Sequence, residues 1–186
     1  MNILAEASEG VPPVWEAAAK TRTVMNVPLR ELVHISKAYP KQTAFKKVWI
    51  VENSGVFSSL ADAAPDAPLV CTHGQFKLAA LLLMNFLVKD GYQLYYAGDI
   101  DPEAIRIATR LLERYPSHVK LWKMTVKDYE KSLSEETISN ERLKKLDSIN
   151  SKELLEVIDS VKNVKKAGYQ EALIFEMVEE LKSMYE

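Results

Sequence analysis

Cysteine and long hydrophobic runs are the two features this 186-residue chain most clearly lacks. Its single cysteine, Cys71, can form neither an intramolecular disulfide nor a cysteine-based zinc cluster, so we expect a reducing, cytoplasmic environment. The longest hydrophobic run, Leu78–Met84, is far shorter than the roughly 20 residues that span a bilayer. The opening MNILAEASEG also lacks the basic start and apolar stretch of a secretory signal. We therefore expect a soluble protein without a membrane partner.

An excess of basic residues is missing as well. Lys and Arg number 24 against 26 Asp and Glu, which gives a net charge of −2. This balance argues against a protein that coats nucleic acid through bulk attraction. It does not exclude an enzyme that holds nucleic acid locally, because the clustered carboxylates of a metal-dependent phosphodiesterase offset basic residues in a whole-chain count.

Three regions differ in their residue patterns. Residues 1–44 are expected to form a helical extension, with helical spacing from about Val11 to Tyr39-Pro40. Residues 45–125 alternate short β-rich runs with helical runs, which is typical of parallel strands joined by crossover helices. Residues 126–186 are charged and rich in helix formers, and are expected to form a C-terminal helical appendage. The predicted fold class is α/β, with a mainly parallel four-stranded sheet in the middle region.

The expected elements of the middle region follow from its hydrophobic runs. Four strands are predicted at 47–51, 69–72, 92–96 and 119–122, with helices at about 55–64, at about 75–88 and from Pro102 onward. Two amphipathic helices are expected in the appendage, one around Leu154–Val161 and the other around Leu173–Met184. Their periodicity is equally compatible with helices that pack back on the sheet and with helices that form a dimer, so the oligomeric state stays open.

Three carboxylates follow two of the predicted strands. Glu52 comes directly after the first strand, and Asp99 and Asp101 come just after the third. In open parallel sheets ligands bind at the carboxyl ends of the strands. Acids gathered there raise one another's pKa unless a cation is present. Magnesium prefers oxygen ligands and is commonly shared with substrate phosphates, so the set fits phosphoryl chemistry.

Each of these acids also has a purely structural interpretation. Asp101 before Pro102 is a favourable helix start, Asp99 after Gly98 suits a turn, and Glu52 fits a solvated loop. Spacing alone does not decide between these interpretations and a metal site.

The ordered motifs resemble a Toprim domain. They read VWIVEN at Glu52, then LVCTHG, then YYAGDID at Asp99 and Asp101, and cover about residues 45–125. The Glu-Asn pair and the last motif are most similar to the C-terminal Toprim-like domain of the Wadjet plasmid-defence nuclease subunit, which is related to the topoisomerase VI A subunit. The resemblance implies a Toprim-like Rossmannoid sandwich as the fold.

The resemblance also implies an activity. Glu52 would be a metal ligand or general acid/base, and Asp99 and Asp101 would be ligands of Mg²⁺, for which Mn²⁺ could substitute. The substrate would be DNA, hydrolysed or nicked, because the winged-helix domain with a nucleophilic tyrosine that strand-passing relatives need is not seen in this sequence. In the larger Wadjet subunits this domain follows a long N-terminal portion, whereas about 45 residues precede the first strand here. Either the chain is a module of a larger protein, or partners of an SMC-like bacterial defence complex engage the DNA.

Four further residues are weaker candidates for substrate binding. His73 and Gly74 follow the second strand, where glycine allows close approach of a phosphate. Lys77, one turn into the next helix, is placed to reach a phosphate, although a solvated lysine is the simpler interpretation, and Lys123 after the fourth strand would complete the charge balance of the site. Asn53 is expected to cap the helix after the first strand.

Two alternatives to a nuclease remain. One is a catalytically silent module that keeps the fold and docks a partner through its C-terminal helices. The other is a phosphoryl-transfer enzyme of another α/β family, which is less consistent with the sequence because the Asp-x-Asp pair follows the third strand and no glycine-rich phosphate loop occurs.

Overall fold

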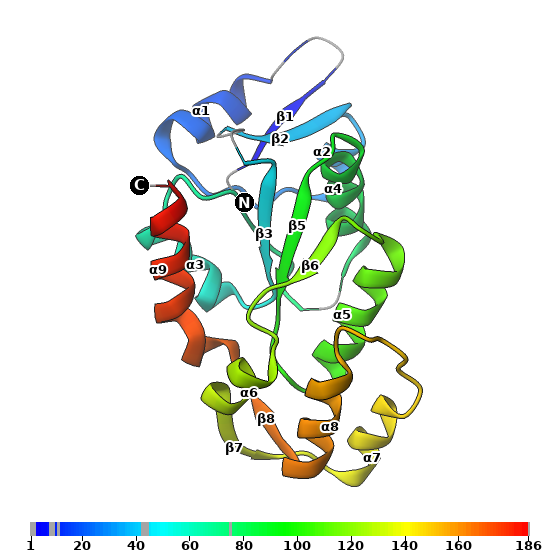
Figure 1. The fold of residues 1–186 in the computed structure, drawn as a ribbon. Helices are drawn as coiled ribbons and strands as arrows, with labels where there is room; N and C mark the ends of the chain where they lie inside the picture. Colours follow the sequence, from blue (N-terminus) through cyan, green and yellow to red (C-terminus); the bar gives the residue numbers. More distant parts are fainter. Residues whose placement is uncertain (1–2, 8–9, 11, 42–44, 75, 186) are drawn as a thin grey trace.

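The computed structural model describes residues 3–7, 10, 12–41, 45–74 and 76–185. A four-stranded parallel sheet lies at the centre of the molecule, with the order β4-β3-β5-β6 (Figure 1). Its strands are β3 (Lys47–Val51), β4 (Leu69–Cys71), β5 (Gln93–Ala97) and β6 (Val119–Leu121). The predicted α/β class and parallel sheet are confirmed, and the strand bounds differ from the prediction by one residue at most. None of the helices described in the chain is long and apolar enough to cross a membrane.

The sheet is sandwiched between two layers of helices (Figure 1). On one face α4 (Leu78–Lys89) and α5 (Pro102–Arg114) pack against the side chains of Ile50 and Tyr96. On the other face α3 (Ser54–Ala63) and α9 (Ile174–Tyr185) pack against Trp49 and Val51. Both faces are therefore covered, which explains why the strands read as continuous apolar runs. The predicted start of the second helix, Gln75, lies outside the described residues.

The N-terminal region contains a small sheet that the sequence did not predict. Helices α1 (Pro13–Thr21) and α2 (Leu29–Leu32) are present, but β1 (Ile3–Glu6) and β2 (Lys37–Pro40) form an antiparallel pair. Tyr39 and Pro40, expected to end a helix, belong to β2. Strands of four residues are too short for alternation to stand out, so the longer helical pattern hid them. Val11, the expected start of that pattern, lies outside the described residues.

The C-terminal region contains more than the two predicted amphipathic helices. Those two correspond to α8 (Leu155–Val164) and α9. The sequence missed the other elements, which are α6 (Val126–Ser132), β7 (Leu133–Thr137), α7 (Asn140–Leu143), the 3-10 helices η1 (Lys144–Leu146) and η2 (Gln170–Leu173), and β8 (Lys166–Gly168). Strands β7 and β8 pair antiparallel across a register shift. We call residues 126–168 the C-terminal lobe.

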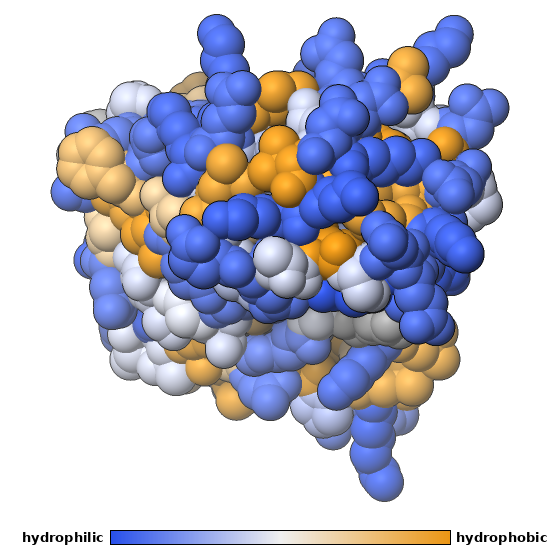
Figure 2. All heavy atoms as spheres, turned by 90° about the horizontal axis from the view of Figure 1, so that it is seen from below, coloured by the Kyte–Doolittle hydropathy of each residue, from blue (hydrophilic) through white to orange (hydrophobic). Residues whose placement is uncertain are grey.

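The C-terminal lobe lies at the carboxyl ends of the central strands (Figure 1). Seen from that end of the molecule, hydrophilic side chains cover most of the surface around smaller apolar patches (Figure 2). The lobe shares a hydrophobic core with the sheet, because buried Tyr129 and Ile158 belong to the same cluster as Ile100 and Ile105. The lobe is therefore placed to contact whatever the strand ends carry.

Candidate functional site

The Glu52 carboxylate lies against the end of the neighbouring strand. The Tyr96 hydroxyl, from β5, donates a hydrogen bond to Glu52 Oε2 at 3.2 Å. A Cβ added at Gly98 would lie 2.9 Å from Glu52 Oε2 and 2.8 Å from the Tyr96 hydroxyl. The ends of β3 and β5 thus meet so closely that only a glycine fits between Glu52 and the loop that carries the two aspartates.

The loop of Asp99 and Asp101 is held from the other side by β8 and the residues that follow it. Ile100, between the two aspartates, exchanges backbone hydrogen bonds with Gly168 at 2.8 and 3.0 Å. The backbone N–H of Gln170 donates to Asp99 Oδ1 at 2.9 Å. The C-terminal part of the chain therefore fixes both the course of this loop and the orientation of the Asp99 carboxylate.

Asp101 has partners at both carboxylate oxygens. Oδ1 accepts a hydrogen bond from the backbone N–H of Ala104 at 2.8 Å, so the predicted helix cap is confirmed. Oδ2 forms an ion pair with Arg142 Nη2 of α7 at 2.7 Å. The structural interpretation of Asp101 is thus correct, and it does not remove the residue from the strand-end cluster.

The three carboxyl groups have shifted pKa values. Burial raises the pKa of Glu52, and the nearby charges of Asp99 and Asp101 raise it further, while the Tyr96 hydroxyl opposes the shift. Burial also raises the pKa of Asp99 and of Asp101 from the ordinary value, against the hydrogen bonds from the Gln170 and Ala104 backbones and, at Asp101, the charge of Arg142. Burial therefore disfavours the charged form of each acid, a penalty that a bound cation would reduce.

The chemistry of these donors fits a hard divalent cation, although their arrangement is not that of a closed metal cage. Across the described part of the chain, no three His, Cys, Asp or Glu side chains stand together as a set that could hold a metal ion. Magnesium needs only one or two protein carboxylates, with water and substrate oxygens completing its shell. Glu52 and Asp99 are the oxygen donors best suited to it, while Asp101 is engaged by Arg142.

Three of the weaker candidates follow β4. The backbone N–H of Gly74 donates to the Glu52 carbonyl oxygen at 3.3 Å, and His73 and Gly74 both have positive φ values, of 53° and 86°. His73 and Lys77 line a groove of about 910 Å³ between α3, α4 and residues 24–29. The structure thus brings Gly74 against the backbone of Glu52 and places His73 and Lys77 in the groove, whose lining does not include Glu52, Asp99 or Asp101.

The fourth candidate, Lys123, is directed elsewhere. Its ammonium forms an ion pair with Glu180 of α9 at 2.9 Å. Asn53 caps α3 as predicted, because its side-chain oxygen accepts from the backbone N–H groups of Gly55 and Val56. The Asn53 amide also donates to Glu171 Oε1 at 2.6 Å, a contact that the sequence did not reveal.

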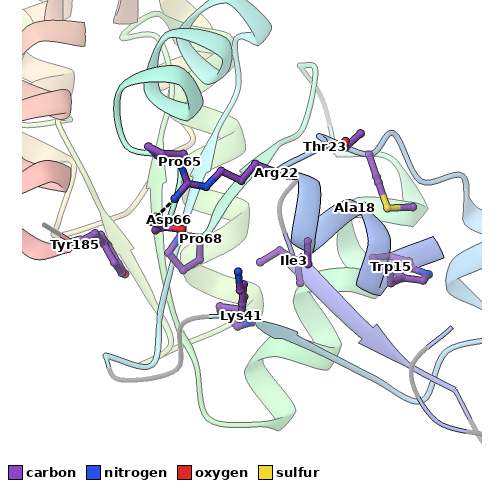
Figure 3. A pocket seen from close by; sticks show the side chains of 13 residues that line it. Ile3, Trp15, Ala18, Arg22, Thr23, Lys41, Pro65, Asp66, Pro68 and Tyr185 are labelled. Atoms are coloured by element: carbon purple, nitrogen blue, oxygen red, sulfur yellow. Dashed lines mark hydrogen bonds and ion pairs between the residues drawn. The ribbon is translucent and has the colours of Figure 1, made fainter. Parts of the chain in front are cut away.

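A second hollow lies away from the strand-end acids. It measures about 220 Å³ and is formed by α1, the end of β2, the segment before β4 and Tyr185 (Figure 3). Trp15 and Ile3 contribute apolar walls, and Arg22 reaches across to Asp66 at 3.1 Å. None of the candidate site residues lines it, so the strand-end acids remain the centre of interest.

Several residues at the site escaped sequence reasoning. Tyr96 lies within the predicted third strand and is fully buried, yet its hydroxyl donates a hydrogen bond to Glu52. Arg142, Gln170 and Glu171 belong to segments whose mixed charges show no pattern that points to the strand ends. Only the three-dimensional return of the chain after β6 places them there, so no local sequence signal could have found them.

Comparison with known families covers the strand-end site and the C-terminal elements together. Residues 25–181 match the family model described as "Protein of unknown function C-terminus (DUF2399)". The chain belongs to the DUF2399 family. The match includes Glu52, Asp99 and Asp101 as well as Arg142 and Gln170, so the acids and their C-terminal partners lie within one DUF2399 unit. No curated protein matches the chain.

Proposed function

We propose that this chain is a magnesium-dependent nuclease domain of the Toprim type, which hydrolyses or nicks DNA phosphodiesters. The observation that carries the proposal is the meeting of Glu52 with the Gly98–Asp101 loop at the carboxyl ends of two adjacent parallel strands. Ligands of open parallel sheets bind at this edge. The resemblance of the strand-end motifs to Toprim domains adds the reaction class and the DNA substrate.

Glu52 and Asp99 would hold the cation, and Asp101 would join them as a third ligand only when its carboxylate is released by Arg142. Bound there, magnesium supplies charge stabilisation to a phosphate and activates a water. Glu52 would also serve as general acid or base, as the resemblance implies, because its carboxylate pairs with the Tyr96 hydroxyl and its pKa is raised, as are those of the two aspartates. The Tyr96 hydroxyl holds Glu52 Oε2 and thereby orients the carboxylate toward the aspartate loop.

The groove that contains His73 and Lys77 supports a chain-like substrate. It runs along α3 and the first turns of α4, where Ser54, His73 and Lys77 offer hydrogen-bond donors and a positive charge, and Asp62 adds one negative charge at the far end of α3. A helix start and a lysine both favour a phosphate group. We propose that the DNA backbone enters along this groove, and that partners of an SMC-like anti-plasmid defence complex supply the remaining DNA contacts that a net charge of −2 does not provide.

Calorimetric titration with Mg²⁺ or Mn²⁺ tests the metal site directly, and nicking of supercoiled plasmid tests the activity. We expect millimolar or tighter binding to the wild-type chain and at least tenfold weaker binding to Asp99→Asn. Asp159→Asn is the matched control, because Asp159 is an exposed acid on α8. Absence of binding of either ion at millimolar concentration, both in the wild-type chain and in a variant that lacks the Arg142 charge, would contradict the proposal whatever the plasmid assay shows.

A second candidate function is a catalytically silent module that keeps the same fold. The ion pair between Arg142 and Asp101 favours it, because that contact neutralises one of the three acids within the chain itself. Such a module would bind no divalent ion at the strand ends, and Asp99→Asn would then leave calorimetry and plasmid integrity unchanged. The same titration therefore separates the two candidates.

A further inference from the structure

Arg142 is the one basic side chain in direct contact with the strand-end acids among the described residues. Its Nη2 lies 2.7 Å from Asp101 Oδ2 and 2.7 Å from Glu103 Oε2, and its Nη1 lies 2.9 Å from Glu136 Oε1. The side chain is 28% exposed, so the pairs are partly shielded from water. The guanidinium pairs with three carboxylates and supplies positive charge to them, as a bound metal ion would.

With the Arg142 contact in place, both carboxylate oxygens of Asp101 have a partner. Oδ1 is used by the α5 cap, at 2.8 Å from the Ala104 nitrogen, and Oδ2 is used by Arg142. A divalent ion that approaches Asp101 must therefore compete with one of these two contacts. Losing the cap would destabilise α5, whereas losing the ion pair only requires one side chain to move.

The helix that carries Arg142 is anchored independently of Asp101. Its backbone N–H donates to the capping Ser139 hydroxyl at 3.3 Å, and the following Leu143 and Leu146 are buried in the core. Glu103 and Glu136 would still bind the guanidinium after it left Asp101. Arg142 can thus release Asp101 by a small rearrangement of its side chain while α7 stays in place.

We propose that Arg142 is an internal counter-ion that blocks Asp101, and that loading of the site with a divalent cation requires the guanidinium to leave this carboxylate. The inference rests on the proposed function, because it concerns control of the same metal site. If Arg142 blocks Asp101, then α7 and the C-terminal lobe control metal binding at the site. A partner or substrate phosphate that draws Arg142 away from Asp101 would promote metal binding.

Calorimetric titration of the full chain with Mn²⁺ tests the proposal, using Arg142→Gln and the control Lys145→Ala. Lys145 also carries one positive charge on the same segment, but its ion pair is with Glu103, at 2.8 Å, rather than with Asp101. We expect Arg142→Gln to tighten the Mn²⁺ dissociation constant about tenfold and Lys145→Ala to change it less than threefold. Melting curves show whether each variant is folded.

The outcomes separate the two proposals. Tightening in Arg142→Gln alone, or binding that appears only in this variant, supports the block. If the wild-type chain binds Mn²⁺ and Arg142→Gln binds it with the same or weaker affinity, the block is overturned and the metal site is retained. If Mn²⁺ binding tightens equally in Arg142→Gln and Lys145→Ala, the effect is one of local charge, and the block is again overturned. Binding in neither chain overturns both proposals.

A measurement on the wild-type protein keeps the test open if Arg142→Gln does not fold. The Arg142 Nε proton donates to Glu103 Oε2 at 3.1 Å and gives a side-chain signal in a proton–nitrogen NMR spectrum. Saturating Mg²⁺ should shift or broaden this signal as the guanidinium rearranges. An Arg142 signal that stays fixed while Mg²⁺ binds would overturn the proposal.

Discussion

Gly98 is the residue on which the geometry of the candidate site depends most directly. Its backbone does not need the freedom of glycine, since Gly98 is not among the described residues with positive φ. Glycine is required at this position because it has no side chain. The Tyr96 hydroxyl and the Glu52 carboxylate occupy the space where a Cβ would lie. The glycine of the YYAGDID motif thus allows the loop with Asp99 and Asp101, at the end of β5, to lie close to Glu52 at the end of β3.

Gly98→Ala should therefore damage both stability and cation binding. The Tyr96 side chain is fully buried and cannot easily yield, so we expect a loss of about 1–3 kcal/mol in the free energy of unfolding, as in other overpacked sites. Urea unfolding measures the loss. In the background Tyr96→Phe the shortest clash disappears, so the same glycine substitution should cost less there, and an equal cost in both backgrounds would show that the cause lies elsewhere.

At the residue scale, sequence reasoning succeeded where a residue's role is local. Asn53 and Asp101 cap the helices that follow them, as their types and positions predict. It failed where a role depends on distant parts of the chain. Arg142 lies 41 residues from Asp101 along the chain, and no periodicity joins an arginine in a charged segment to one particular carboxylate.

At the scale of elements, the central strands were predictable because burial on both faces makes them apolar throughout. The strands β7 and β8 were not, because β7 reads Leu-Ser-Glu-Glu-Thr and is mostly exposed. Strand β8 depends on Gly168, where a Cβ would lie 2.5 Å from the Ser132 hydroxyl and 3.1 Å from the Tyr129 ring. A strand made by the close approach of two backbones carries little hydrophobic signal.

Helix α9 closes one face of the sheet, and its last turn should make that contact sensitive to alkaline pH. The Tyr185 ring packs edge-to-face on Trp49 at 5.5 Å, and burial raises the pKa of its phenol well above the ordinary value. The unfolded chain gives up this proton near pH 10, whereas the folded chain resists doing so. The stability contributed by the neutral phenol is therefore complete below about pH 10 and is lost as the pH rises further.

Tyr185→Phe should remove this loss. Between pH 8 and pH 10.5 the wild-type chain should lose more unfolding free energy than the variant, as measured by urea unfolding at both values. Other groups titrate in both proteins and cancel in the difference. Parallel pH dependence of the two chains would show that Tyr185 is as well hydrated in the folded chain as in the unfolded one.

At the scale of the whole molecule, the question is whether α9 belongs to the core or is free to dock a partner. Its inner face carries Met177 and Leu181, both fully buried in a cluster with Trp49 and Trp122. Its outer face carries Phe175, which is 75% exposed. The amphipathic pattern that the sequence left open between fold-back and dimer is therefore satisfied on one side by the chain's own sheet.

Two substitutions on this one helix should separate its two faces. Leu181→Ala opens a cavity in the core and should lower the free energy of unfolding by about 2–5 kcal/mol, whereas Phe175→Ala should change it by less than about 0.5 kcal/mol. Urea unfolding followed by tryptophan fluorescence measures both, because Trp49 and Trp122 lie in the same cluster. If circular dichroism follows the same single transition, sheet, α9 and lobe unfold as one unit.

A Leu181→Ala chain as stable as the wild type would mean that α9 is only loosely attached to the sheet. The helix would then become the leading candidate for a partner-binding element.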